Sequence, residues 1–501
     1  MDIEYIIVQA GGKGTRMESL TRNKPKALVP VDNLPMLFHL FRMFSNKKFV
    51  VIGDYKYDVL QQYLEAFAEV DYQLIRGTGA YGTCAGIPAA LDCVPENTPF
   101  MLIWSDLVLP ASFKFPENDG NYIGVAKDFP CRWKFEHGEF CEERSEEFGV
   151  AGLFLFQNKS VLEQVPAEGE FVRWLKESSF PKKEFALYRA KEYGLISEYH
   201  KQMPSKRCRP FNKITVDGDT VVKEGIDDQG KELAARECDW YQRAMRGNFQ
   251  QIPKIYSLHP LRMERIDGEP VHTYAALTLE QKKTILFEII DCLKRIQSLG
   301  EIPADADSYY EAYVGKTFER LKKVRELVPF AQDEAVLING KRCRNIFFHR
   351  SEVEKLAAAY VPDKFRFIHG DCTFSNILLR SDGMPVLIDP RGYFGHTQFY
   401  GDPAYDWAKL YYSIVGNYDQ FNLKRFQLDI LDREVSLHIE SSHWEDMEEY
   451  FFSQLPGEIT PRQIKLFHAI IWLSLTTYAW EDYDSICGAY YNGLFYLEDV
   501  L

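Results

Sequence analysis

The sequence predicts two domains of different class: an α/β domain with a mostly parallel sheet, then a domain in which a small sheet-bearing lobe precedes a larger helical lobe. A chain of 501 residues exceeds what one hydrophobic core usually supports. The pattern of apolar residues also changes after the basic, proline-containing segment 201–213. We therefore expect a first domain over 1–205, a small lobe over 206–270 and a helical lobe over 271–501.

Alternating strand-like and helix-like segments predict the α/β domain. Four short apolar runs end in small or polar residues: "YIIVQA", "FVVIG", "YQLIRG" and "FMLIWSD". Residues 56–68 between them have the apolar spacing of a helix. This alternation is typical of a parallel sheet flanked by helices.

A different pattern defines the second domain. Residues 213–225 alternate apolar and polar side chains around Asp217-Gly218, which predicts a β-hairpin. The stretch "KELAARECDWYQRAM" then predicts a helix. From about residue 270 helical patterns dominate, apart from short strands expected near 367 and 387.

Composition and charge exclude several classes of protein. Hydrophobic residues make up 46% and charged residues 26%, as is usual for a soluble globular protein. The net charge of −14 argues against broad nucleic-acid binding but permits small anionic substrates. No signal peptide or membrane span is expected. The cysteines are scattered without a C-x-x-C pair, which favours free thiols in a cytoplasmic protein.

A glycine-rich loop follows the first apolar run. Gly11-Gly12-Lys13-Gly14 would let backbone N–H groups approach phosphates, and two cations follow at Arg16 and Lys26. Residues 11–16, "GGKGTR", and 25–28, "PKAL", match position for position the signature of the nucleotidyltransferase family that activates sugar phosphates and phosphocholine. The chain resembles that family over its first domain, which implies a Rossmann-like mixed sheet.

The resemblance implies a reaction and roles for these residues. In this family a phosphate monoester attacks the α-phosphorus of a nucleoside triphosphate and expels pyrophosphate, so positioned cations lower the barrier. Arg16 would hold the triphosphate, and Lys26 would bridge the incoming phosphate and the α-phosphate. The loop would be formed by Gly11, Gly12, Gly14 and Thr15.

Later segments would complete this first site. Asp106 ends the run "FMLIWSD" and would bind Mg²⁺, although an aspartate there is more often a turn residue. The region around 76–91 resembles the segment that recognises the base. The family's second acidic ligand has its nearest counterpart here in Glu198. The candidates for base recognition are Gly77, Thr78, Gly82 and Thr83.

The stretches "IHGDCTFSNILL" and "VLIDPRG" indicate a second site. Phosphoryl transfer to a hydroxyl needs a carboxylate base and oxygen ligands for Mg²⁺. The pattern H-G-D-x-x-x-x-N followed by I-D resembles the aminoglycoside phosphotransferase and choline kinase family, relatives of protein kinases. The resemblance implies Asp371 as base and Asn376 and Asp389 as metal ligands, with His369 supporting the loop and Asp406 bracing it.

A kinase-like bilobal α+β fold also needs nucleotide contacts in its small lobe. Lys223 on the predicted strand "TVVKEG" would pair with a helix glutamate, either Glu237 or its competitor Glu232. The segment "LRMERIDGEP" resembles the hinge between lobes, where backbone groups from Met263 to Arg265 would meet adenine.

Together the two sites predict consecutive reactions in one bifunctional enzyme. The kinase would phosphorylate a small alcohol with ATP, and the transferase would join that phosphate to a nucleoside monophosphate, with Mg²⁺ in both steps. The domain order resembles bacterial fusions of a phosphocholine cytidylyltransferase and a choline kinase, so CTP and a choline- or ethanolamine-type alcohol are favoured. Such a product would serve the decoration of cell-surface polysaccharide or lipid.

Two alternatives stay open. The chain equally resembles a sugar kinase joined to a sugar-1-phosphate nucleotidyltransferase, which would make a nucleotide sugar. One domain could instead be a non-catalytic module that binds nucleotide and regulates the other, although the complete sets of site residues weigh against it. The expected partners are nucleotides and a small alcohol or sugar, without nucleic acid; a homo-oligomer is compatible with the sequence.

Aromatic residues offer a clue to the substrate. Choline binds over aromatic faces, and Trp472, Trp480 and Tyr483 in the C-terminal segment could form such a pocket, as could Trp133 in the first domain. Aromatic residues at this density in a helical lobe more often belong to the core, and sugars also stack on aromatic rings. The identity of the alcohol therefore stays open.

Overall fold

A computed structural model describes residues 1–77, 79–202, 212–274 and 276–501. The chain divides into two compact units, Met1–Arg207 with Glu481–Asp484, and Cys208–Trp480 with Ser485–Leu501. The boundary expected at 205/206 lies outside the described residues. Within the described ranges, no helix is both long enough and apolar enough to cross a membrane.

The first unit is built on a mixed sheet with the strand order β10-β9-β11-β6-β1-β4-β5. The four runs expected to be strands are β1, β4, β5 and β6, and they pair in parallel. β11 runs antiparallel to β6 and also pairs with β8, beside which lies β12. The strands are β1 (Tyr5–Gln9), β4 (Lys48–Gly53), β5 (Asp71–Arg76), β6 (Phe100–Trp104), β8 (Tyr122–Ala126), β9 (Lys134–Glu136), β10 (Glu139–Cys141), β11 (Gly149–Phe156) and β12 (Lys183–Leu187).

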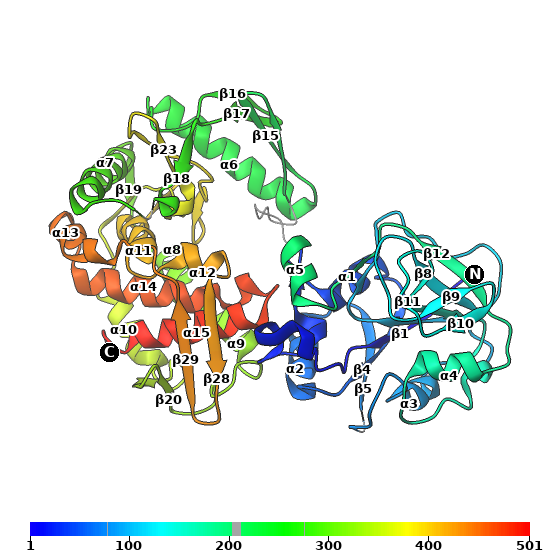
Figure 1. Cartoon of the computed structure of the whole chain (residues 1–501). Coiled ribbons are helices and arrows are strands. Elements are labelled where there is room, and N and C mark those ends of the chain that lie inside the picture. Colours follow the sequence, from blue (N-terminus) through cyan, green and yellow to red (C-terminus); the bar gives the residue numbers. More distant parts are fainter. Residues whose placement is uncertain (78, 203–211, 275) are drawn as a thin grey trace. The chain divides into compact units, whose positions relative to one another are not determined.

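Helices cover both faces of this sheet (Figure 1). Because side chains alternate along a strand, Leu102 of β6 faces a core shared with α3 and α4, while Phe49 of β4 packs on Phe41 of α1 with ring centroids 4.7 Å apart. The helix expected at 56–68 is α2. The helices of this unit are α1 (Met36–Met43), α2 (Tyr57–Phe67), α3 (Ile87–Asp92), α4 (Phe171–Glu177) and α5 (Ile196–Gln202).

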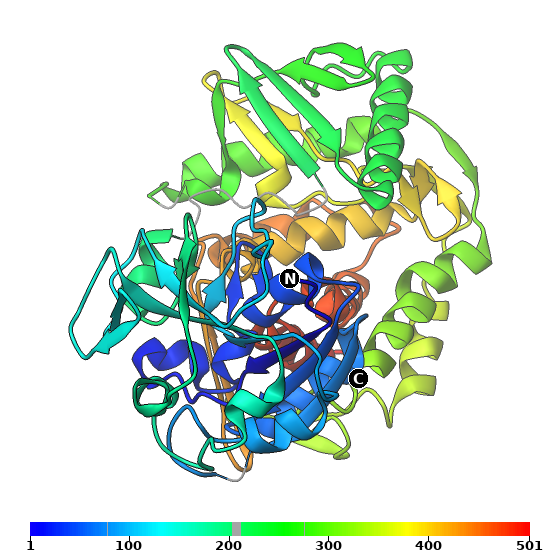
Figure 2. The same ribbon diagram turned by 90° about the vertical axis from the view of Figure 1, so that its right-hand side faces the viewer.

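The second unit begins with a small lobe made of one sheet and one helix. The sheet has the order β14-β15-β17-β16, and its first hairpin is the one expected around Asp217-Gly218. Helix α6 lies beside the strands (Figure 2). Its N-terminus is capped by Asp227, whose side chain accepts a hydrogen bond from the Gly230 N–H at 2.7 Å. The elements are β14 (Asn212–Asp217), β15 (Thr220–Gly225), α6 (Asp228–Arg246), β16 (Ile255–Leu258) and β17 (Leu261–Glu264).

The large lobe is mainly helical, as expected. The short strands near 367 and 387 are β22 and β24. β18 pairs with β23, so the chain between β17 and β18 connects the sheets of the two lobes. The main elements are α7 (Leu279–Gln297), α9 (Lys316–Val324), α11 (Pro403–Ile414), α14 (Pro461–Leu475), α15 (Tyr483–Leu497), β18 (Gly268–Pro270), β22 (Lys364–Phe367), β23 (Ile377–Arg380) and β24 (Pro385–Leu387).

One sheet of the large lobe was not expected. β20 and β21 form a hairpin, and β20 also pairs in parallel with β29 of a second hairpin. The Asn339-Gly340 turn between β20 and β21 is a hairpin signal that the prevailing helical pattern obscures. The strands are β20 (Ala335–Ile338), β21 (Lys341–Arg344), β28 (Phe426–Ile430) and β29 (Glu434–Ile439).

Replacing Phe154 with alanine should destabilise the first unit. Phe154 is fully buried, with its ring centroid 5.1 Å from that of Phe171 and 6.1 Å from that of Trp104. We expect a loss of about 3–5 kcal/mol in the free energy of unfolding, because a large cavity forms. The measurement is chemical denaturation followed by fluorescence. The matched change Tyr188→Ala, at a side chain that is 65% exposed, should cost under about 0.5 kcal/mol.

Candidate active sites

The glycine-rich loop of the first unit lies between β1 and a 3₁₀ turn, Thr15–Thr21. Gly14 has φ +63°, and a Cβ there would lie 3.1 Å from Cβ of Lys26, so glycine permits both the turn and the close approach. A Cβ at Gly12 would meet nothing within 4 Å. The loop therefore packs against Lys26 at Gly14, whereas free space surrounds Gly12.

Lys26 and Asp106 form an ion pair beside this loop. Lys26 begins a short 3₁₀ turn and is 9% exposed. Its ammonium group contacts the carboxylate of Asp106, which directly follows β6. Parallel strands β1 and β6 are neighbours, so their carboxyl ends bring the loop and the aspartate together.

A second carboxylate, Glu192, completes this cluster. The short strand β13 (Lys191–Glu192) pairs with β7 (Leu107–Val108), which places Glu192 opposite Leu107. The Tyr193 N–H donates to the carbonyl oxygen of Asp106 at 3.0 Å. Burial and then the charge of Asp106 raise the pKa of Glu192, whereas Lys26 and Arg16 act to lower it. Two carboxylates and two cations therefore share one site.

The structure favours Glu192 over Glu198 as the second acidic group. Glu198 lies on α5, is 40% exposed and pairs with Lys201 of the same helix at 2.8 Å. Glu192 is not predicted from the sequence, because a two-residue strand carries no periodic signal. Its pairing with the residues after Asp106 is the feature that identifies it.

The segment expected to recognise the base docks on the start of α4. The Thr83 hydroxyl accepts from the Phe171 N–H at 2.9 Å, and the Gln9 side chain at the end of β1 donates to the carbonyl oxygen of Thr83. A Cβ at Gly82 would clash with the backbone of Gly169. The Gly77 N–H donates to the carbonyl oxygen at the end of β4, 2.6 Å away. The candidate Thr78 lies outside the described residues.

The chemistry of these groups fits Mg²⁺. Carboxylate oxygens are the ligands it prefers, and it is often completed by substrate phosphates. Among the described residues, no cluster of three or more His, Cys, Asp or Glu side chains could hold a metal alone. Asp106 and Glu192 would thus supply the protein's share in the first site.

In the second unit, an ion-pair cluster around a buried lysine joins the two lobes. The Lys223 ammonium on β15 lies 2.6 Å from Glu237 of α6 and 2.5 Å from Asp389, which follows β24. Burial raises the pKa of Glu237 to about 7, while Lys223 acts in the opposite direction. The competitor Glu232 pairs instead with Arg236.

Asp406 holds the loop that carries Asp371. Its carboxylate accepts from the backbone N–H groups of His369 at 2.8 Å and Gly370 at 2.7 Å. The His369 ring contacts the carbonyl oxygen of Ile388 at 2.9 Å. Burial raises the pKa of Asp406 to about 7, against the effect of its two backbone donors. The loop is therefore fixed from both sides.

Asp371 sits among groups that keep it ionised. The Asn376 amide donates to the Asp371 carboxylate at 3.0 Å, and Lys409 contacts the other oxygen at 3.0 Å. Burial acts to raise the pKa of Asp371, but the charge and hydrogen bond of Lys409 together with the charges of His369 and Arg391 outweigh it, and the pKa lies below its ordinary value. A carboxylate in this state can accept a proton. Asn376 and Asp389 carry the oxygen atoms that fit Mg²⁺.

The expected adenine contacts lie inside the small sheet. Met263 belongs to β17 and is 7% exposed. The N–H groups of Glu264 and Arg265 already donate to the carbonyl oxygens of Lys254 and Asp219, each at 2.8 Å. Because these two N–H groups already form hydrogen bonds within the small lobe, they are not available to adenine. Backbone groups that could contact adenine would have to come from the connection after Arg265.

Trp472 packs in the core of the large lobe. It is fully buried, its ring centroid lies 4.6 Å from that of Tyr412 and 5.0 Å from that of Phe421, and its indole N–H donates to His468 at 2.9 Å. These neighbours enclose the ring, so it is not a surface on which a substrate could stack.

Of the other aromatic candidates, two are buried and one is partly exposed. Trp133 is 7% exposed and belongs to the core of the first unit. Tyr483 is 1% exposed, in the segment Glu481–Asp484 of that unit. Trp480 is partly exposed.

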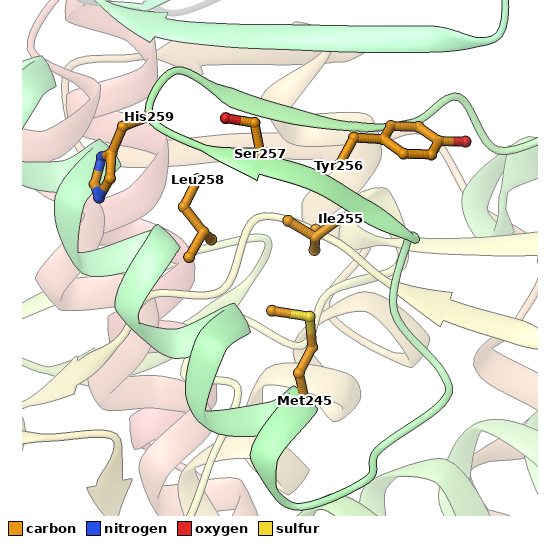
Figure 3. Close-up of a pocket in the computed structure, with 6 residues that line it drawn as sticks. All are labelled: Met245, Ile255, Tyr256, Ser257, Leu258 and His259. Atoms are coloured by element: carbon orange, nitrogen blue, oxygen red, sulfur yellow. The ribbon is translucent and has the colours of Figure 1, made fainter.

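A surface hollow of about 460 Å³ lies in the small lobe between α6 and β16. Met245 comes from α6, and the other lining residues come from β16 and the residue after it (Figure 3). None of these residues belongs to the two sites. The lining residues are Met245, Ile255, Tyr256, Ser257, Leu258 and His259.

Fold and sites together define a nucleotidyltransferase domain joined to a kinase-like phosphotransferase domain. Two family models match the chain: the MobA-like NTP transferase domain over residues 6–113, and the phosphotransferase enzyme family over residues 213–436. Each of the two units therefore matches one of these families over part of its length.

Similarity to individual proteins is confined to parts of the chain. A UTP–glucose-1-phosphate uridylyltransferase of Haloferax volcanii is 32% identical over 110 residues, 21% of this chain and 44% of that protein. A mannose-1-phosphate guanylyltransferase catalytic subunit beta of Dictyostelium discoideum is 25% identical over 183 residues, 32% of this chain and 51% of that protein. The chain thus spans about half the length of these curated relatives. The structure of HddC from Yersinia pseudotuberculosis, 19% identical, covers 40% of this chain and 98% of its own, with a TM-score of 0.35.

Replacing Glu192 with glutamine should impair nucleotidyl transfer. Loss of one carboxylate from the cluster should lower the rate of pyrophosphate release by about 10²-fold, the range seen when a transition-state contact is removed, and raise the Mg²⁺ concentration needed for half-maximal rate. The measurement is a pyrophosphate assay across a magnesium titration. Glu198→Gln should change the rate less than about twofold, as surface changes usually do. If Glu198→Gln instead lowered the rate more than Glu192→Gln, Glu198 would be the second acidic group of the site.

Proposed function

We propose that the chain phosphorylates a small alcohol with ATP and then transfers a nucleoside monophosphate to the new phosphate. The observation that carries this proposal is that both clusters of charged groups are complete in one chain. Arg16, Lys26, Asp106 and Glu192 gather at the first site. Lys223, Glu237 and Asp389 are in contact at the second, where Asp371 contacts Asn376.

In the kinase step, Asp371 accepts the proton of the alcohol. The alcohol oxygen forms a bond to the γ-phosphorus of ATP, and the bond from that phosphorus to the bridging oxygen breaks, releasing ADP. Lys223 holds nucleotide phosphates, oriented by Glu237. Mg²⁺ bound by Asn376 and Asp389 would supply positive charge for the transferring group.

In the transferase step, the charges of the first unit act on a nucleoside triphosphate. An oxygen of the phosphate monoester forms a bond to the α-phosphorus, and the bond from that phosphorus to the bridging oxygen breaks, releasing pyrophosphate. Lys26 neutralises charge that builds between attacking and α-phosphates, and Arg16 holds the leaving group. Asp106 and Glu192 would hold Mg²⁺.

The favoured version uses CTP and an amino alcohol of the choline or ethanolamine type. It gives a cytidine-activated precursor for cell-surface decoration, made by a cytoplasmic enzyme. Its support is the order of the two domains and the "PKAL" form of the signature at 25–28. The candidate cation pocket is reduced to Trp480, because Trp472 and Tyr483 are buried.

The alternative version makes a nucleotide sugar. The matched relatives act by name on glucose 1-phosphate and mannose 1-phosphate, and this favours a sugar as the alcohol. A sugar kinase of this kind would have to phosphorylate the anomeric hydroxyl. A purely regulatory role for one domain is disfavoured by the complete charge clusters in both.

Single substitutions should separate the two reactions. Asp371→Asn should lower ATP-dependent phosphorylation by about 10²–10⁴-fold, because the proton acceptor is lost, yet leave pyrophosphate release from added phosphate monoester intact. Lys26→Met should do the converse, with a loss of about 10²–10³-fold in pyrophosphate release. ADP and pyrophosphate are measured separately on the full chain. If each variant lost both activities, the assignment of separate sites would be wrong.

A substrate matrix should decide between the versions. Pyrophosphate release is measured with ATP and Mg²⁺ for CTP, UTP, GTP and dTTP, each against choline, ethanolamine, glycerol, hexoses and amino sugars. Release confined to CTP and an amino alcohol would support the favoured version. Pyrophosphate release with a hexose would support the alternative version, in which the enzyme makes a nucleotide sugar.

A further inference from the structure

One face of helix α11 contacts the loop that carries Asp371. The Asp406 carboxylate accepts from two backbone N–H groups of this loop, and the Ser413 hydroxyl accepts from the Phe374 N–H at 3.0 Å. Lys409 lies between them on the same helix, three residues after Asp406 and four before Ser413. Because residues three and four apart are neighbours on a helix surface, Lys409 faces the loop as well.

Lys409 contacts the carboxylate of Asp371 directly. Its ammonium group lies 3.0 Å from Oδ1, while the Asn376 amide donates to Oδ2. The ammonium also lies over two aromatic rings, 5.2 Å from the centroid of Tyr412 and 5.9 Å from that of Tyr418. The Lys409 side chain is 13% exposed and that of Asp371 37%. The carboxylate is thus the more accessible member of the pair, and the rings and the helix hold the ammonium beside it.

Lys409 differs from the other lysine of this site in its number of counter-ions. Lys223 contacts two carboxylates, Glu237 and Asp389. Among the residues that the structure describes, Asp371 is the one carboxylate within 4.0 Å of the Lys409 ammonium. The catalytic loop supplies no cation itself, because residues 372–375 read "CTFS". The charge of Lys409 therefore depends on a single partner, and that partner is the group proposed to accept the proton.

Lys409 stays charged despite its burial. Burial acts to lower its pKa and Arg391 acts in the same direction, but the charge and hydrogen bond of Asp371 together with Tyr405 outweigh them, and the pKa lies above its ordinary value. The charge of Arg391 reaches Asp371 too. Its guanidinium, however, donates to the hydroxyls of Tyr405 and Tyr393 at 2.8 and 2.9 Å. Lys409 is therefore the cation in direct contact with the proton acceptor.

The kinase step changes the charge on both sides of this ammonium group. An alcohol that gives its proton to Asp371 must place its oxygen within hydrogen-bond reach of the carboxylate, about 2.6–3.2 Å. The γ-phosphorus then bonds to that same oxygen, with negative charge spread over its three equatorial oxygens. Protonation makes Asp371 neutral, so Lys409 loses its counter-ion as the phosphoryl group brings negative charge beside it.

We propose that Lys409 is a catalytic residue of the kinase step, and that its ammonium group moves from Asp371 to an oxygen of the transferring phosphoryl group. The proton passes from the alcohol to Asp371, the bond from the alcohol oxygen to the γ-phosphorus forms, and the bond from that phosphorus to ADP breaks. This role rests on the proposed kinase function. It fits an amino alcohol and a sugar equally, because Lys409 contacts the phosphoryl group and not the rest of the acceptor.

Replacing Lys409 with methionine removes the charge but keeps the length of the side chain. ADP release by the full chain is measured with ATP, Mg²⁺ and whichever of choline, ethanolamine, glycerol, hexoses and amino sugars is phosphorylated fastest. We expect kcat to fall by about 10²–10³-fold, as when a charge-stabilising contact of the transition state is lost, with KM for ATP and for the alcohol within threefold. Lys409→Arg should recover part of kcat. Lys322→Met, at an exposed position of α9, is the matched control and should change none of these constants. An effect confined to KM for ATP would contradict the proposed role.

A binding measurement shows whether Lys409 acts on the phosphoryl group or only through Asp371. Aluminium fluoride with ADP and Mg²⁺ imitates the transferring phosphoryl group, and the dissociation constant of ADP is measured by calorimetry with and without it. Lys409→Met should reduce the gain in affinity from aluminium fluoride at least tenfold. The affinity for ADP alone should stay within twofold, which also shows that the variant is folded. The same reduction should occur when Asp371 is already asparagine. If it disappears in the Asp371→Asn background, Lys409 only positions Asp371 and the proposed role is wrong.

The wild-type chain and Asp371→Asn separate two kinds of failure. If the wild-type chain releases ADP with none of the alcohols, the kinase function is wrong, and the role of Lys409 is wrong with it. If the wild-type chain is active and Asp371→Asn is not, while Lys409→Met keeps its kcat within threefold, the kinase function stands and only the role of Lys409 is wrong.

Discussion

The contacts of Lys223 with Glu237 and Asp389 hold the second unit in a catalytic arrangement. They join a strand and the following helix to a loop that lies far away in the sequence, with a separation of 166 positions from the lysine to the aspartate. A buried lysine needs carboxylate partners, because removing either one leaves uncompensated charge in a poor solvent. The placement of α6 against β15 and the position of the loop that carries Asp389 therefore depend on one another. The pairing of β18 with β23 attaches the chain that leaves the small lobe to a sheet of the large lobe.

In the first unit, too, carboxylates hold a buried lysine in place, but they come from different kinds of element. Lys26 contacts Asp106, and Glu192 comes next to them on a strand that pairs just beyond β6. In both units the cations proposed to bind phosphates are held by carboxylates that also suit a divalent metal. The charges are thus fixed before a nucleotide arrives, which is what transition-state stabilisation by preorganised groups requires. The net acidic chain can bind anionic nucleotides because its cations are local and oriented.

Much of this arrangement could be predicted because it is encoded in contiguous stretches. The parallel strands of the first sheet, the hairpin at 213–225 and the two signature loops each combine a periodic pattern with glycine or charged residues at fixed offsets. Glu192 could not be found in this way, since only its pairing with the chain after Asp106 sets it apart from nearby acids. The competition between Glu237 and Glu232 likewise needed the packing of α6 on β15.

Aromatic residues were the weakest guide, because size and polarity alone do not tell a core ring from a binding face. Trp472 and Trp133 are surrounded by other rings and apolar chains. Met263 to Arg265 show the same limit for the backbone. The sequence marks the end of the small lobe, but which N–H groups the sheet uses follows from the register of β17 with both β15 and β16.

The parallel pairing of β20 with β29 has a consequence for how the chain is made. Besides their hairpin partners in β21, Leu337 and Ile338 pair with Glu434 and Val435, so the ribosome must release the whole segment between them, which carries Asp371 and Asp389, before this sheet can close. The mixed sheet of the first unit, by contrast, has all its strands by Leu187. Contacts between distant segments form slowly, and domains generally fold in the order of synthesis. The transferase sheet can thus form early, while the kinase lobe waits for the end of translation.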